Sequence, residues 1–241
     1  MATTLILAMA QAHAATDALS DHCIYPAGEL ASRFLKAHRL DGENVSGEPS
    51  IATCVKWPGK ESWHLAVLIY DTQVRYEKHM LIALVDLPKG RMVATYWTKV
   101  DADATTPYHS GSVSIDIAPY QLRPGVRAFG VEVATRFSAI QESGSGPERT
   151  LFVREGSQIR PVLQSMPMSR WEYIDGYRPY LSTEESPRPA TEDFTYTIGI
   201  APTTHNGYAD LRITRRSSIA SHPPVVEVLH YDGREYPRPR N

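Results

Sequence analysis

The stretch from Val126 to Leu163 constrains the fold most, because its residues alternate between apolar and polar. Phe129, Val131, Val133 and Phe137 fall on one face of an extended segment, and a period of two is typical of a half-buried strand. Two further extended segments follow, separated by turns that contain glycine: Thr150–Arg154 and Gln158–Leu163. The pattern predicts a meander of three antiparallel strands.

Short apolar runs with turn signals between them continue through most of the chain. Pro88-Lys89-Gly90, His205-Asn206-Gly207 and Asp232-Gly233 each predict a hairpin turn. Residues 26–39 are the one convincing helix, with an apolar face of Ala27, Leu30, Ala31, Phe34 and His38. We therefore expect a mainly β protein, with antiparallel sheets arranged as a sandwich or barrel and one N-terminal helix.

The segment Asp175–Asp193 is rich in proline, glycine and acidic residues, which predicts a long loop or linker. The 241 residues suit one large all-β domain or two small ones. We expect residues 15–241 to form a single β-rich domain, with a possible subdivision near residues 175–193.

The N-terminus has two features of a secretory signal peptide. Leu5–Ala10 is a short apolar core, and Ala12-His13-Ala14 fits the small-x-small cleavage pattern, which would make residues 1–14 the signal. No Lys or Arg precedes Leu5, so a frayed apolar terminus is the alternative. No other apolar run has the length of a transmembrane helix. We expect a periplasmic or secreted protein.

Cys23 and Cys54 are the two cysteines of the chain. An even pair in an exported protein predicts one disulfide, and two buried thiols are the alternative. The bridge would stabilise the fold by roughly 3 kcal/mol through loop closure.

Three segments carry a resemblance: Cys54-Val55-Lys56-Trp57-Pro58, Leu122–Val131 and Leu151–Gly156. They are similar to segments of uncharacterised secreted β-rich proteins of Gram-negative bacteria, in which a Cys-Lys-Val-Trp-Pro-like stretch precedes the β-rich body. The order here is Cys-Val-Lys-Trp-Pro. The resemblance implies export and a β-rich fold, and it assigns no activity and no site residue.

Recognised catalytic motifs are absent from the sequence. There is no Gly-x-Ser-x-Gly elbow, no His-Glu-x-x-His and no Cys-x-x-Cys, so we predict no catalytic residue, cofactor or metal site. His222, His230 and Asp232 lie close in sequence, and His230 and Asp232 would share a strand face. They could ligate a cation, although a solvated strand end is the plainer interpretation.

Aromatic residues gather before the long loop, at Trp171, Tyr173, Tyr177 and Tyr180. Aromatic rings with a polar group suit sugar stacking or a protein interface, so these four are the predicted binding residues. The alternative is that they fill the core and line a loop.

The net charge of −2 gives no reason to expect a nucleic acid as partner. We expect an exported, non-catalytic β protein that binds a protein or a cell-envelope component such as a glycan. A cell-envelope hydrolase of unrecognised type is the alternative.

Overall fold

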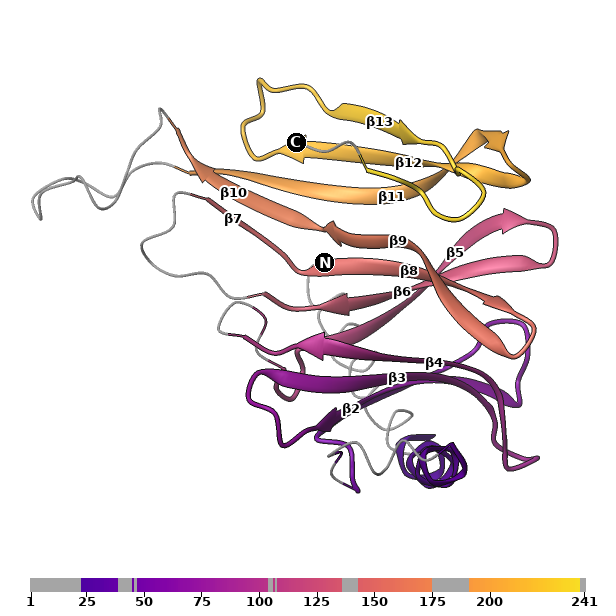
Figure 1. Ribbon diagram of the computed structural model, residues 1–241. Coiled ribbons are helices and arrows are strands. Elements are labelled where there is room, and N and C mark those ends of the chain that lie inside the picture. Colours follow the sequence, from indigo (N-terminus) through magenta and orange to yellow (C-terminus); the bar gives the residue numbers. More distant parts are fainter. Residues whose placement is uncertain are drawn as a thin grey trace, which may run out of the picture. The chain divides into compact units, whose positions relative to one another are not determined.

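The computed structural model describes residues 23–38, 45, 47–103, 106, 108–135, 143–174 and 191–238. The predicted signal peptide, most of the loop at 175–193, Tyr177 and Tyr180 lie outside these residues. Within them the fold class is confirmed, because the chain forms antiparallel sheets with one helix near the N-terminus (Figure 1). The chain forms two compact units, and each is described by itself.

Unit 1 comprises Met1–Asp101, His109–Ile115 and Glu155–Ile159. It contains four strands in sequential antiparallel order: β1 (Ile51–Lys56), β2 (Trp63–Asp71), β3 (Glu77–Asp86) and β4 (Arg91–Asp101). Strands β2 and β3 are buried on both faces, which explains their nearly continuous apolar sequence. The turn at Glu155–Ile159 joins the free side of β4, where the Thr95 N–H donates to the Ser157 carbonyl.

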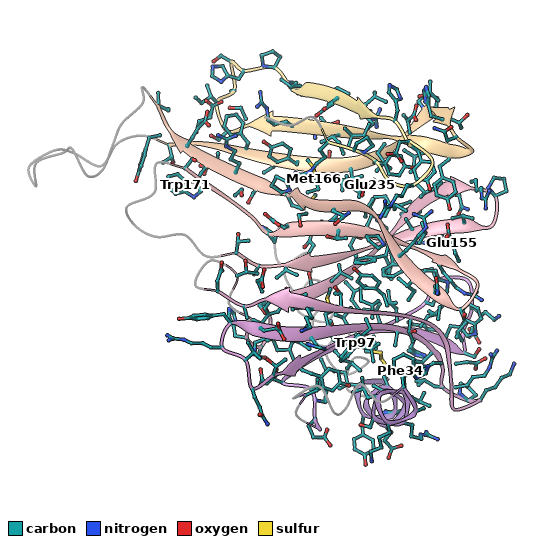
Figure 2. All side chains as sticks on the ribbon, in the orientation of Figure 1. Phe34, Trp97, Glu155, Met166, Trp171 and Glu235 are labelled. Carbon is teal, nitrogen blue, oxygen red and sulfur yellow. A yellow bond between two sulfur atoms is a disulfide. The ribbon has the colours of Figure 1, made fainter. Side chains whose placement is uncertain are left out.

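The helix covers residues 23–37 of the described chain and packs on one face of this sheet. Its buried face comprises Cys23, Ala27, Leu30, Ala31 and Leu35. The predicted disulfide between Cys23 and Cys54 is present and ties the first turn of the helix to β1. The placement of His38 on the apolar face was wrong. Its ring is exposed at the end of the helix, where it lies against Phe34, which Figure 2 labels.

Unit 2 comprises Ala102–Tyr108, Asp116–Arg154 and Arg160–Asn241. Four strands of this unit pair in the order β9-β8-β6-β5. They are β5 (Val113–Arg123, in unit 2 from Asp116), β6 (Val126–Val133), β8 (Glu148–Glu155, in unit 2 to Arg154) and β9 (Gln158–Pro167, in unit 2 from Arg160). This is the predicted meander, with β5 added beside β6. The middle of β6 is buried on both faces, whereas the alternation predicted a strand with one exposed, polar face.

The second sheet has the order β13-β12-β11-β10-β7. Its strands are β7 (Ser143–Ser145), β10 (Ser169–Tyr173), β11 (Thr191–His205), β12 (Tyr208–Ser217) and β13 (Val225–Leu229). The inner face packs on the apolar core of unit 2 through residues such as Ile198, Leu211 and Leu229. Among the described residues no strand follows Asp232-Gly233, where the sequence predicted a hairpin turn; instead the Tyr236 N–H donates to the Val162 carbonyl.

Candidate functional site

A cluster of polar side chains surrounds Asp210 at one end of the second sheet. Residue Asp210 is fully buried, and its carboxylate is approached from three sides. The Thr203 hydroxyl donates to Oδ2 at 2.5 Å, and Nδ1 of His205 and Nδ1 of His230 lie 2.8 and 3.0 Å from the same oxygen. The two imidazole rings have centroids 4.1 Å apart. We call Thr203, His205, Asp210 and His230 the Asp210 cluster.

Local backbone structure explains how residues distant in sequence meet here. The register of β11 against β12 shifts between Ile200 and Thr204, and this irregularity brings the end of β11 over Asp210. The hairpin closes at Asn206-Gly207, and both have the positive φ (47° and 84°) that a tight hairpin of this kind requires. The Asn206 side chain donates to the Tyr231 carbonyl, which fastens the hairpin beside His230.

The cluster lies at the end of the sheet where the β11–β12 hairpin turns. Asp210 precedes the core residue Leu211 in β12, and His230 directly follows the last residue of β13, Leu229. The hairpin end covers the carboxylate, while the His205 and His230 side chains remain 48% and 58% exposed.

Hydrogen bonds keep Asp210 ionised despite its burial. Burial raises the pKa of Asp210, but the hydrogen bonds from Thr203, His230 and His205 outweigh that effect and hold the pKa below its ordinary value. The site thus combines a buried anion with two imidazoles that solvent can reach.

The cation ligands considered from sequence make different contacts. Nδ1 of His222 lies 2.7 Å from Oε1 of Glu192, on another part of the sheet. The Asp232 carboxylate accepts the backbone N–H groups of Arg234 and Glu235 and so caps its own turn. Of the three, His230 alone enters the cluster. His205, Asp210 and Thr203 had no sequence signal beyond the Asn-Gly turn between them.

Of the predicted binding aromatics, Trp171 (labelled in Figure 2) and Tyr173 lie within the described residues, on β10. Both are half-buried, and their rings meet edge to face at a centroid distance of 5.2 Å. Trp171 pairs with Asp193 in β11, a neighbour of the core residue Phe194. The two aromatic rings therefore occupy the face of the sheet opposite to Phe194.

Strand β13 forms the edge of the sheet and pairs with β12 alone among the described residues (Figure 1). Val225, Val226 and Val228 are 49%, 56% and 40% exposed. An edge of this kind presents backbone groups together with β-branched side chains, and Glu227 is the one charged residue of the strand.

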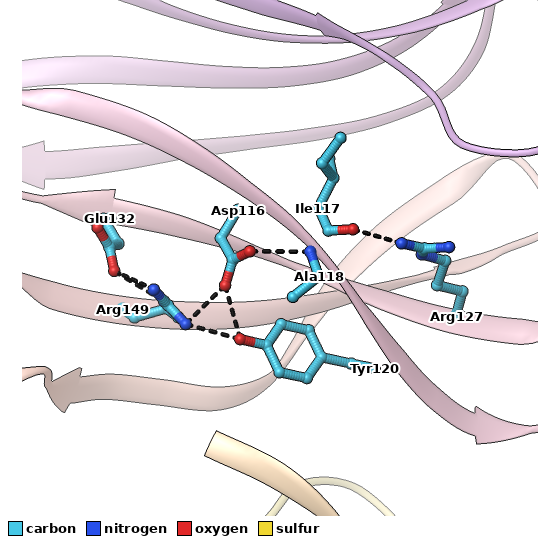
Figure 3. A network of polar contacts seen from close by, with 7 residues as sticks. All are labelled: Asp116, Ile117, Ala118, Tyr120, Arg127, Glu132 and Arg149. Carbon is cyan, nitrogen blue, oxygen red and sulfur yellow. Dashed lines mark hydrogen bonds and ion pairs between the residues drawn. The ribbon is translucent and has the colours of Figure 1, made fainter. Parts of the chain in front are cut away.

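A second polar network lies between β5, β6 and β8 (Figure 3). The Arg149 guanidinium contacts the carboxylates of Glu132 and Asp116 and the Tyr120 hydroxyl. All four side chains are largely buried and mutually paired. We assign this network to the stability of the sheet.

Comparison with family models, with curated proteins and with solved structures finds no match to this chain. No helix of the described residues is long and apolar enough to cross a membrane.

Proposed function

We propose that this protein is exported and acts without catalysis, by binding a protein partner in the cell envelope. The partner would contribute an extended segment that pairs with β13 and enlarges the second sheet by one strand. The observation that carries this proposal is the edge of β13, which pairs with β12 alone among the described residues and has three exposed valines.

The chemistry of the edge supports a peptide as the occupant. Unpaired backbone N–H and C=O groups supply affinity that does not depend on sequence, and the side chains at alternate positions supply specificity. On β13, Val226 and Val228 lie on the outer face with Thr214 and Arg212 of β12 opposite them. This surface favours a strand with small or β-branched residues facing the valines.

The disulfide supports export. Disulfides persist in oxidising compartments, such as the periplasm and the extracellular space, and are rare in the cytosol. The bridge between Cys23 and Cys54 is therefore in keeping with a signal peptide at residues 1–14 and a mature chain that begins at Ala15.

The test uses two double variants. In V226K/V228K the charges disfavour strand addition, and in the control V74K/Y76K equally exposed apolar residues of a turn in unit 1 are replaced. Each protein, from Ala15 onward, is crosslinked in a cell-envelope extract, and the captured proteins are identified. We expect a stoichiometric protein partner that the control captures and V226K/V228K loses. Equal capture by both variants, or enrichment of glycan fragments alone, would reject the proposal.

The Asp210 cluster favours a second candidate, an envelope hydrolase. An imidazole oriented by a buried carboxylate can act as a general base, because the carboxylate stabilises the imidazolium that forms. Screening with envelope substrates would test this candidate, and activity that H205Q and H230Q both retain would reject it.

A further inference from the structure

The donor atoms of the Asp210 cluster match the ligands of a transition-metal site. In the part of the chain that the structure describes, this is the one group of three His, Cys, Asp or Glu side chains whose ligand atoms all lie within 4.8 Å of one another. The group offers two imidazole nitrogens and one carboxylate oxygen. We propose that His205, Asp210 and His230 bind a divalent late transition-metal ion, with Zn²⁺ as the representative.

The distances permit this with a small adjustment. Ligands about 2.0–2.1 Å from a tetrahedral zinc ion lie roughly 3.3 Å from one another. The two Nδ1 atoms are 2.8 and 3.0 Å from Oδ2 of Asp210, so each contact must lengthen by a few tenths of an ångström. Both imidazoles are half-exposed and can move by this amount without disturbing the core.

The surroundings of Asp210 favour a bound cation. Thr203 and the two imidazoles satisfy the buried Asp210 carboxylate by hydrogen bonds, and no Lys or Arg of the described chain forms an ion pair with it. A cation held between the imidazoles and the carboxylate would supply the positive charge that a buried anion favours. Thr203 donates to the carboxylate and would orient it as an outer-sphere partner.

The ligand set also selects the class of metal. Imidazole nitrogen suits zinc, copper and nickel, whereas calcium and magnesium prefer sites made of oxygen atoms alone. Three protein ligands leave a fourth position on the exposed side of the cluster for water or an anion. Because binding at Nδ1 requires neutral imidazoles, each Nε2 would carry the proton and donate to solvent.

The partner-binding proposal plays no part in this inference, and zinc alone tests it. Tag-free protein is titrated with ZnCl₂ in a calorimeter at neutral pH, together with H205Q, H230Q and D210N. The control is H222Q, which removes an exposed histidine that also contacts a carboxylate but, among the described residues, belongs to no such three-ligand group. Circular dichroism verifies that every variant is folded.

We expect one zinc ion per chain, and affinity at least about tenfold weaker in each of the three cluster variants. H222Q should bind as the wild type does. Cobalt(II) added in place of zinc should give the intense visible absorption of a four- or five-coordinate ion, which the cluster variants lose.

The proposal is overturned if the wild type takes up no zinc, or if H205Q and H230Q bind as tightly as H222Q. A weak, six-coordinate cobalt spectrum would overturn it as well. V226K/V228K should retain zinc binding, so failure of the partner-binding proposal leaves this one standing.

Discussion

Arg149 of β8 lies directly opposite Glu132 of β6, and its guanidinium holds that carboxylate through two nitrogens (Figure 3). Nη1 also reaches Oδ2 of Asp116 at 2.6 Å. The three charged side chains are only 15–21% exposed. One cation thus compensates two carboxylates that come from different strands.

Replacement of Arg149 by Met should destabilise unit 2 by about 2 kcal/mol, because it leaves two largely buried carboxylates without their cation. The matched control is Arg216→Met, on an exposed position of β12, which should change stability by less than about 0.5 kcal/mol. Urea denaturation measures both free energies of unfolding. Equal losses in the two variants would contradict the assignment of a structural role to Arg149.

Gly130 leaves room for the Arg149 side chain. A Cβ at position 130 would lie 3.0 Å from Cδ of Arg149 and 3.2 Å from Cβ of Asp116. Gly130→Ala should therefore destabilise the protein by about 1 kcal/mol through overpacking. In an Arg149→Ala background this cost should shrink, since the crowded side chain has gone. A double-mutant cycle measures the coupling, and additive effects would show that the crowding is relieved elsewhere.

The meander could be predicted from sequence because its signals are local. β6, β8 and β9 each keep a period of two or an apolar run, and Gly156 marks the turn between the last two. The order of the five-stranded sheet could not be predicted in this way. It depends on pairing between segments far apart in the chain, such as β7 with β10, which no local pattern specifies.

The Asp210 cluster could not be predicted from the sequence. The sequence grouped His230 with its neighbours His222 and Asp232, whereas in the structure it meets His205 and Asp210. That meeting depends on the irregular register of β11 and on the packing of β13 beside β12. No periodic pattern in the sequence predicts either the register shift or this pairing.

Removal of the disulfide by C23S/C54S should cost about 3 kcal/mol, because the bridge closes a loop of 31 residues in the unfolded chain. The helix should loosen first, since its first turn loses the link to β1. Urea denaturation with and without dithiothreitol measures this effect. The reductant should destabilise the wild type and leave the double variant unchanged, and a wild type insensitive to reductant would contradict the prediction.

Glu192 offers a prediction about pH. Hydrogen bonds from Ser217 and then from His222 lower the pKa of Glu192 below its ordinary value. A carboxyl whose pKa is lower in the folded state stabilises the fold above its unfolded pKa of about 4.3, and this contribution is lost as the pH falls through the folded value. Ser217→Ala should raise the pKa of Glu192 in an NMR titration.

The stability difference between wild type and Ser217→Ala should accordingly be present at pH 7 and shrink once Glu192 is protonated in both states. Denaturation curves at pH 7 and at about pH 3 compare the two conditions. A difference that is the same at both pH values would assign the effect to the hydroxyl alone.

Asp210→Asn isolates the charge of the buried carboxylate, since the side chain keeps its shape. In metal-free protein at pH 7 we expect a loss of about 1–2 kcal/mol, because the hydrogen bonds from Thr203, His205 and His230 no longer meet an anion. The control is Asp232→Asn. The Asp232 carboxyl is exposed and caps a turn, so its replacement should reduce stability by less. A ligand that binds only the folded state raises its stability. Added zinc should therefore raise the Tm of the wild type and of Asp232→Asn, and it should raise the Tm of Asp210→Asn far less. A zinc-dependent rise in Tm that is equal in all three proteins would place the ion elsewhere in the chain.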